Sequence, residues 1–275
     1  MTTQAAVRNV AIFLYQGVEV LDFAGPAEVF SSAGEGAFHV FTIARTREPV
    51  VSQRFLKILP DYAIGEGPRP DIVVIPGGDQ QASTADPRVI EWIRTVSAGE
   101  LTMSVCTGAF LLAKAGLLDG LDATTHWSAL ESLARAAPRT RIVGGERFVD
   151  AGRVLTTQGV SAGIDGALHV VQRFLGAEAA WRTARYMQYA WEPLDASPEL
   201  RAAVFHDWAR LVQLEEARVI ADPRDAGAQA RLGIALASLG QLEHAARHLK
   251  RAQQLGYDDS LQAFVLAQRR CGIVV

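Results

Sequence analysis

Short apolar segments alternate with helical patterns of apolar residues from residue 7 to about residue 176. Each short segment is continuously apolar, which is typical of parallel strands that are buried on both faces and joined by crossover helices. The segments are VAIFLY (10–15), HVFTIA (39–44), DIVVIP (71–76), LTMSVC (101–106) and RVLTT (153–157). The pattern therefore predicts a layered α/β fold with a mostly parallel sheet.

Residues with known preferences for helix ends mark the helices between these strands. In STADPRVIEWIRTVSAGE, Asp86 is placed to cap a helix whose first residue is Pro87, and Gly99 follows the end of that helix. In TGAFLLAKAG, Gly116 ends a helix that begins directly after a predicted strand. Strand and helix signals therefore agree on the α/β assignment.

The alternation stops near residue 193, and the rest of the chain reads as helix. We therefore predict an α/β domain over residues 1–192 and a small all-α appendage over residues 193–275. Because a lone repeat cannot bury its apolar face, we expect the appendage to pack on the α/β domain or a second subunit; a module that binds a protein partner is the alternative. The positions of a tetratricopeptide repeat are filled by Leu232, Gly233, Leu236, Gly240, Leu242, Ala245, Leu249 and Ala252.

Composition narrows the class of protein. The chain has 275 residues, 49% of them hydrophobic and 21% charged, with a net charge of -3. We therefore expect a globular, cytoplasmic protein without a nucleic-acid or membrane partner, since no basic block, signal peptide or run of roughly 18 apolar residues occurs. The two cysteines, Cys106 and Cys271, are too far apart for a CxxC pair, and the histidines lack metal-ligand spacing. Neither a metal nor a cofactor is expected.

Cys106 stands where a predicted strand meets a predicted helix. Ligands of open α/β sheets bind at this carboxyl edge of the strands. The N-terminus of the helix favours thiolate over thiol, which predicts that the pKa of Cys106 is lowered from about 8.5 toward 7 or below. Gly108 permits close approach of the backbone. An inert buried cysteine remains the alternative, because free cysteine is among the most buried residue types.

Four segments carry a resemblance to a known family: GVEVLDFAGPAEVF (17–30), DIVVIPGG (71–78), SVCTGAFLLAKAGLLDGLDATTHW (104–127) and TTQGVSAGIDGALHVV (156–171). They resemble the ThiJ/PfpI superfamily, and specifically the branch that holds isonitrile hydratases and the sensor domains of AraC-like regulators. The resemblance implies the class I glutamine amidotransferase-like fold, a flavodoxin-like three-layer sandwich, and a homodimer.

The resemblance also implies a site around the cysteine. Asp22, Cys106 and Thr107 match the catalytic positions of isonitrile hydratase, and the backbone N–H groups of Gly78 and Thr107 are expected to form an anion hole. Protease-like members of the superfamily carry a histidine where this chain has Thr107, which disfavours peptidase and amidase activity. His126 is expected near the cysteine as a supporting residue, with a purely local hydrogen-bonding role as the alternative. Asp22 has an alternative role as a helix cap.

The expected activity is cysteine-dependent hydration of a small-molecule isonitrile to an N-substituted formamide. Two alternatives remain open at this point. One is a ligand or redox sensor that signals through protein contacts. A regulator that binds DNA itself is disfavoured, because DNA binding needs a basic face and residues 193–275 hold ten Lys and Arg against ten Asp and Glu. The other is glyoxalase-like hydration of 2-oxoaldehydes on the same cysteine, because fold analogy does not decide the substrate.

Overall fold

The computed structural model describes residues 7–34, 36–191 and 208–257. The chain divides into two compact units, Met1–Met187 and Gln188–Val275. Residues 192–207, where the sequence predicts the domain boundary, and Cys271 lie outside the described residues. None of the helices in the described ranges combines the length and apolarity that a membrane crossing requires.

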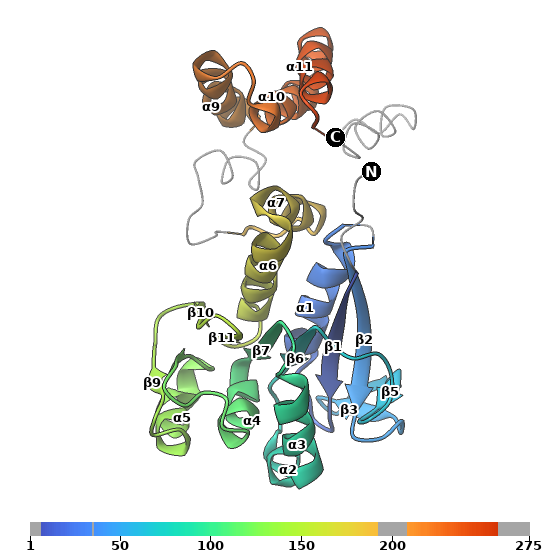
Figure 1. Cartoon of the computed structure of the whole chain (residues 1–275), viewed down its shortest axis with the longest axis vertical. Helices are drawn as coiled ribbons and strands as arrows, with labels where there is room; N and C mark the ends of the chain where they lie inside the picture. Colours follow the sequence, from blue (N-terminus) through green and yellow to red (C-terminus); the bar gives the residue numbers. More distant parts are fainter. Residues whose placement is uncertain (1–6, 35, 192–207, 258–275) are drawn as a thin grey trace. The chain divides into compact units, whose positions relative to one another are not determined.

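A seven-stranded sheet forms the centre of the first unit as far as its residues are described (Figure 1). Its order is β10-β11-β7-β6-β1-β2-β5, and neighbours are parallel except β10 and β11. The strands are β1 (Arg8–Leu14), β2 (Phe38–Ala44), β5 (Tyr62–Ala63), β6 (Ile72–Ile75), β7 (Leu101–Val105), β10 (Phe148–Asp150) and β11 (Val154–Thr157). All the strands predicted from apolar segments belong to this sheet, so the prediction of a mostly parallel sheet is confirmed.

Two shorter strand pairs lie outside the main sheet. An antiparallel hairpin joins β3 (Val50–Ser52) to β4 (Leu56–Ile58), and β8 (Asp122–Ala123) pairs in parallel with β9 (Arg141–Ile142). The hairpin is bonded to the loop that precedes the first helix, because the Gly17 N–H donates to the Val51 carbonyl oxygen over 2.8 Å. It thereby supports the segment that enters the candidate site.

The helices form two groups that cover the sheet in a three-layer arrangement (Figure 1). In the first group α1, α6 and α7 contact one another, and in the second α4 contacts α2, α3 and α5. The helices are α1 (Val20–Ser32), α2 (Gln81–Ala85), α3 (Pro87–Val96), α4 (Ala109–Lys114), α5 (Leu130–Ala136), α6 (Ala162–Leu175) and α7 (Ala177–Tyr186). The flavodoxin-like three-layer sandwich is therefore confirmed.

The central strands are buried because nearly all of their residues are apolar. Every residue of β6 and β7 is buried, and so are residues 10–14 of β1. Burial of a large aliphatic or aromatic side chain stabilises the fold by about 1.5–3 kcal/mol each. The sheet is consequently a rigid base for the turns at its carboxyl edge.

The start of α3 agrees with the sequence prediction. The Asp86 carboxylate accepts a hydrogen bond of 2.8 Å from the Arg88 N–H, and Pro87 is the first helical residue. The cap satisfies an N–H group that has no partner within the helix, and proline lacks such a group. Both residues therefore act as predicted.

In the second unit three described helices pack side by side in sequence order: α9 (Trp208–Ala221), α10 (Ala226–Ser238) and α11 (Leu242–Gln254). A Cβ at Gly233 would lie 2.6 Å from Leu249 Cγ, so α10 and α11 approach closely there. Leu232, Leu236 and Ala245 form a buried cluster. The all-α character of the appendage is confirmed, whereas its assignment as a tetratricopeptide repeat stays a prediction.

Candidate active site

Cys106 lies at the tight turn between β7 and α4. Its backbone φ of 56° falls in the left-handed region, which costs a non-glycine residue on the order of 1 kcal/mol. A 3₁₀ turn (Cys106–Gly108) leads into α4. The Cys106 N–H donates to the Gln158 carbonyl oxygen (3.1 Å), and the Thr125 hydroxyl donates to the Cys106 carbonyl oxygen (2.7 Å). These bonds hold the strained turn at the carboxyl edge of the sheet.

Two glycines allow this turn to pack directly on its neighbours. A Cβ at Gly108 would lie 2.1 Å from the Ile75 carbonyl oxygen, so the predicted close approach of the backbone is confirmed. A Cβ at Gly77 would lie 2.7 Å from the Thr107 nitrogen and 2.8 Å from Asp22 Oδ2. Any side chain at either position would push the turn away from β6 or from the carboxylate.

Asp22 comes from the first turn of α1 and is completely buried. Its Oδ2 accepts a hydrogen bond from the Gly77 N–H (2.9 Å), and its Oδ1 accepts one from the Val160 N–H (3.2 Å). The N-cap position of α1 is Glu19, which makes no capping bond through its side chain. The carboxylate thus binds two segments distant in the chain, and the alternative of a helix cap does not describe it.

Burial raises the pKa of Asp22 from 3.8 to about 7. The N–H groups of Gly77 and Val160 oppose this rise, and so does the Cys106 thiol, which donates to the carboxylate; the nearby charge of Glu19 adds to it. Desolvation penalises the charged carboxylate more than these donors stabilise it. The side chain can therefore gain or lose a proton close to neutral pH.

The predicted lowering of the Cys106 pKa is wrong. Burial, together with the charge of Asp22, raises the pKa of Cys106 from 9.0 to about 12. The backbone N–H and hydroxyl of Thr107 favour the thiolate but contribute less. The resting group is a thiol that shares its proton with Asp22.

The expected anion hole has both of its N–H groups engaged. The Thr107 N–H bonds the Cys106 sulfur, and the Gly78 N–H donates to the Thr107 hydroxyl over 3.1 Å. The same hydroxyl is placed to donate to the Gly78 carbonyl oxygen over 3.3 Å. The Gly78 N–H is thus bonded to the Thr107 hydroxyl at rest, and an anion hole formed by both N–H groups stays a prediction.

His126 lies near the turn, and its polar contacts are local. Its Nδ1 bonds the Ser128 hydroxyl over 2.8 Å, and its ring lies against Gly159, where a Cβ would be 2.2 Å from His126 Cδ2. The neighbouring Thr125, not His126, contacts the Cys106 backbone. His126 thus packs on the segment that leads to Val160, and its role as a supporting residue stays a prediction.

Three contributors were not anticipated from sequence. Val160 donates to Asp22 from a left-handed φ of 54°, which is unusual for a β-branched residue. Gly77, the first glycine of PGG, donates to the same carboxylate. The Tyr15 hydroxyl donates to the Pro76 carbonyl oxygen over 2.9 Å, and burial raises the pKa of Tyr15, with added effects of Asp22 and Cys106. The glycine-containing motifs PGG and QGVS could have indicated the donors Gly77 and Val160. For Tyr15 the sequence indicates only a position in a predicted strand.

A free thiol, a carboxyl and a hydroxyl are the reactive side chains gathered at this turn. The thiol is nearly buried, with 8% of Cys106 exposed. In the described part of the chain, no group of three or more His, Cys, Asp or Glu residues is placed to hold a metal ion. The arrangement is suited to nucleophilic attack by sulfur with proton transfer through Asp22.

The fold and the cysteine turn define an α/β protein of the DJ-1/PfpI class, and a model of the DJ-1/PfpI family matches residues 8–173. The chain belongs to this family. It is 31% identical over 206 residues to isonitrile hydratase of Pseudomonas putida, a match that covers 74% of this chain and 88% of that protein.

Other relatives include transcriptional regulators. The HTH-type regulator GbdR of Pseudomonas aeruginosa is 28% identical over 176 residues, which cover 62% of this chain and 48% of the regulator. A solved ThiJ/PfpI family protein from Pseudomonas syringae superposes with a TM-score of 0.63 at 28% identity, covering 77% of this chain and 90% of that one. DJ-1beta of Drosophila melanogaster superposes with a TM-score of 0.61 at 25% identity over 67% of this chain and all of that one. The family thus contains both enzymes and regulators.

Proposed function

We propose that the protein hydrates an isonitrile, R–NC, to an N-substituted formamide, with Cys106 as nucleophile. The observation that carries the proposal is the buried pair of Cys106 and Asp22, in which the raised pKa of Asp22, about 7, allows the carboxyl to take up and release a proton at neutral pH. An isonitrile carbon must gain both a nucleophile and a proton, and such a pair supplies both to the same atom. The similarity to isonitrile hydratase supports this choice of substrate.

In the first half-reaction the thiol proton passes to Asp22 while the Cys106 sulfur bonds to the terminal carbon. Asp22 then delivers that proton to the same carbon, which leaves the thioimidate R–N=CH–S. The net change is addition of S–H to one carbon, so no external acid is consumed. The thiol therefore needs no lowered pKa, because it loses its proton only during attack.

In the second half-reaction water adds to the thioimidate carbon. Asp22 takes one water proton and passes it to the nitrogen, giving R–NH–CH(OH)–S. The carbon–sulfur bond then breaks as the formamide carbonyl forms, and Asp22 carries the hydroxyl proton to the sulfur. We assign the orientation of this water to Thr107, whose hydroxyl contacts both the sulfur and the Gly78 N–H.

The proposal is tested by incubating the protein with a panel of isonitriles and quantifying the formamides by mass spectrometry. A parallel panel of 2-oxoaldehydes, analysed for 2-hydroxy acids, tests glyoxalase-like chemistry on the same cysteine. We expect formamide production that requires Cys106. Turnover of oxoaldehydes alone would replace the proposed substrate class while retaining the nucleophile.

A sensor is the second candidate function. The similarity to regulators that carry this fold beside another domain favours it, and here the family domain is followed by a separate helical unit. A sensor would bind or react with an electrophile once without releasing product. Formation of a stable Cys106 adduct without multiple turnovers would therefore support the sensor over the enzyme.

A further inference from the structure

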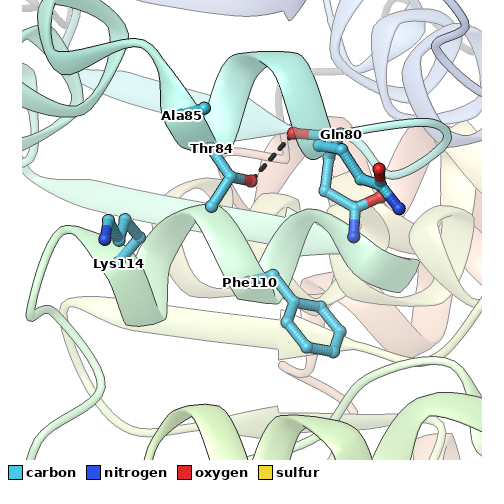
Figure 2. A pocket seen from close by; sticks show the side chains of 6 residues that line it. Gln80, Thr84, Ala85, Phe110 and Lys114 are labelled. Carbon is cyan, nitrogen blue, oxygen red and sulfur yellow. Dashed lines mark hydrogen bonds between the residues drawn. The ribbon is translucent and has the colours of Figure 1, made fainter.

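A groove of about 400 Å³ lies between α2 and α4 (Figure 2). Thr107, Phe110 and Lys114 follow the spacing i, i+3, i+7, which places them along one face of the helical segment. The groove runs along α4. Its Gln80 end adjoins the cysteine turn, because the Gln80 N–H donates to the Gly78 carbonyl oxygen (3.0 Å) and the Gly78 N–H donates to the Thr107 hydroxyl (3.1 Å). Its lining residues are Gln80, Gln81, Thr84, Ala85, Phe110 and Lys114.

The polar groups of this groove are available to a ligand. Within the described residues, the side-chain amides of Gln80 and Gln81 make no hydrogen bond and the Lys114 ammonium makes no ion pair. No carboxylate lines the groove. In Figure 2, Gln80 lies opposite Phe110 while Thr84 lies toward the Lys114 end. A substituent that extends from the sulfur into the groove would therefore meet the Phe110 ring and the Gln80 amide first, and the Lys114 ammonium beyond them.

The geometry points to a substrate whose substituent ends in a carboxylate. We propose that this substituent occupies the groove, that its apolar linker packs on Phe110, and that its carboxylate pairs with Lys114. Thr107 and Lys114 are seven residues apart, which corresponds to about 10 Å along a helix. A medium-length ω-isocyanoalkanoate spans this distance. The choice of an isonitrile as the reacting group rests on the proposed function. The pairing of Lys114 with an anion does not depend on it.

Turnover of a medium-length ω-isocyanoalkanoate and of its methyl ester tests the pairing. We expect the wild-type protein to prefer the acid through a lower KM, and Lys114→Met to reduce this preference by up to about fivefold, the upper end of the range for a solvent-exposed ion pair. Lys114→Arg retains the cation and should retain the preference. Lys250→Met on α11 removes an exposed lysine elsewhere and serves as the matched control. An acid preference that is absent, or unchanged in Lys114→Met, would overturn the inference.

A second measurement does not depend on turnover. The matching ω-formamidoalkanoate and its ester are tested for protection of Cys106 from iodoacetamide, followed by intact-protein mass spectrometry. Stronger protection by the acid that is lost in Lys114→Met supports the groove even if no isonitrile is hydrated, in which case only the proposed function fails. Hydration of isonitriles with equal protection by acid and ester leaves the proposed function standing and removes the groove assignment.

Discussion

At the scale of single residues, the chemistry depends on how many protons Cys106 and Asp22 hold together. Burial raises the pKa of both groups, to about 7 for Asp22 and about 12 for Cys106. At a pH between about 7 and about 12 the pair therefore carries one proton. Thiol with carboxylate and thiolate with carboxylic acid are then two arrangements of the same protonation state.

Replacement of the nucleophile should abolish turnover. We expect Cys106→Ala to lower kcat by about a thousandfold or more, because no covalent thioimidate can form. The free energy of unfolding should change by only about 1 kcal/mol, since few packing contacts are lost. Formamide release and urea denaturation measure the two effects. Turnover that survives in Cys106→Ala contradicts covalent catalysis at this position.

Asp22→Asn should stop hydration and leave the thiol open to alkylation by iodoacetamide. In the wild-type protein kcat/KM should rise with pH through a midpoint near 7, as the pair loses the first of its two protons. The variant should lack this rise and turn over about a hundredfold to ten thousandfold more slowly. Glu19→Gln is the matched control: it removes a charge that raises the pKa of Asp22, so it should move the midpoint downward and keep the rise. Wild-type activity in Asp22→Asn would remove Asp22 from the mechanism.

The same carboxyl predicts a pH dependence of stability. Its pKa is about 7 in the folded protein against 3.8 as an ordinary aspartate, so the folded state binds more protons between these values. Its contribution to the free energy of unfolding is therefore full below about pH 4 and is lost as the pH rises through 7. Asp22→Asn should flatten this decline in denaturation curves measured from pH 4 to 8. Parallel profiles for the two proteins would show that Asp22 titrates at an ordinary pKa.

At the scale of elements, the site depends on the close fit between the turn after β7 and the end of β6. Gly108 sits against the Ile75 carbonyl oxygen, and Gly77 sits between Thr107 and Asp22. The β6 and β7 strands are parallel neighbours, so their carboxyl ends meet at one edge. Backbone atoms, more than side chains, consequently set the distance between sulfur and carboxylate.

Gly108→Ala tests this fit. The added methyl group would overlap the Ile75 carbonyl oxygen, so we expect a loss of about 1–3 kcal/mol in the free energy of unfolding and an altered alkylation rate of Cys106. Gly120→Ala is the control, because Gly120 has a φ of 77° and an added methyl group there would meet no atom within 4 Å. It should cost about 1 kcal/mol through backbone strain alone and leave alkylation unchanged. Equal effects of the two substitutions would show that the contact at Gly108 is unimportant.

At the scale of the whole molecule, the chain has a helical unit in addition to the DJ-1/PfpI family domain. Its described helices bury Leu232 and Leu236 but leave Leu242 39% exposed and Ile220 81% exposed. Such a short helical array presents apolar surface that a longer repeat array would cover. We therefore expect this unit to act in assembly or in contact with a protein partner.

Truncation after residue 192 should change assembly or solubility before it changes the chemistry. The residues that surround Cys106 all precede residue 161, and the last of them is Val160, which contributes an N–H. Light scattering and the alkylation rate of Cys106 measure the two properties. A truncated chain of unchanged size whose thiol loses its reactivity would place the helical unit in the active site.

The neutral charge of the C-terminal residues predicts that the protein does not bind DNA in a salt-sensitive manner. Residues 193–275 hold equal numbers of basic and acidic residues, ten of each. Proteins that bind DNA through phosphate contacts lose affinity steeply as salt rises. Electrophoretic mobility shifts at low and moderate salt, with a family regulator as positive control, measure this. A sequence-specific complex of this protein with DNA that dissociates as salt rises would instead favour a role as a transcriptional regulator.

Much of the fold could be predicted because its signals are local in the sequence. The continuous apolar runs that became β1, β6 and β7 need burial on both faces wherever they lie. Asp86 and Pro87 begin a helix through preferences of their own side chain and backbone. The tight approach at Gly108 follows equally from a glycine placed just after a strand.

The sequence by itself determined the α/β class, the position of Cys106 at a strand-to-helix turn, and the family to which its motifs belong. Only the tertiary structure decided that Asp22 is held by Gly77 and Val160, that the Gly78 N–H is engaged by Thr107, and that the thiol keeps its proton. The bond between Asp22 and Val160 joins residues 138 positions apart. Desolvation depends on everything packed around a group, so it reversed the pKa shift that the local helix terminus predicted for Cys106.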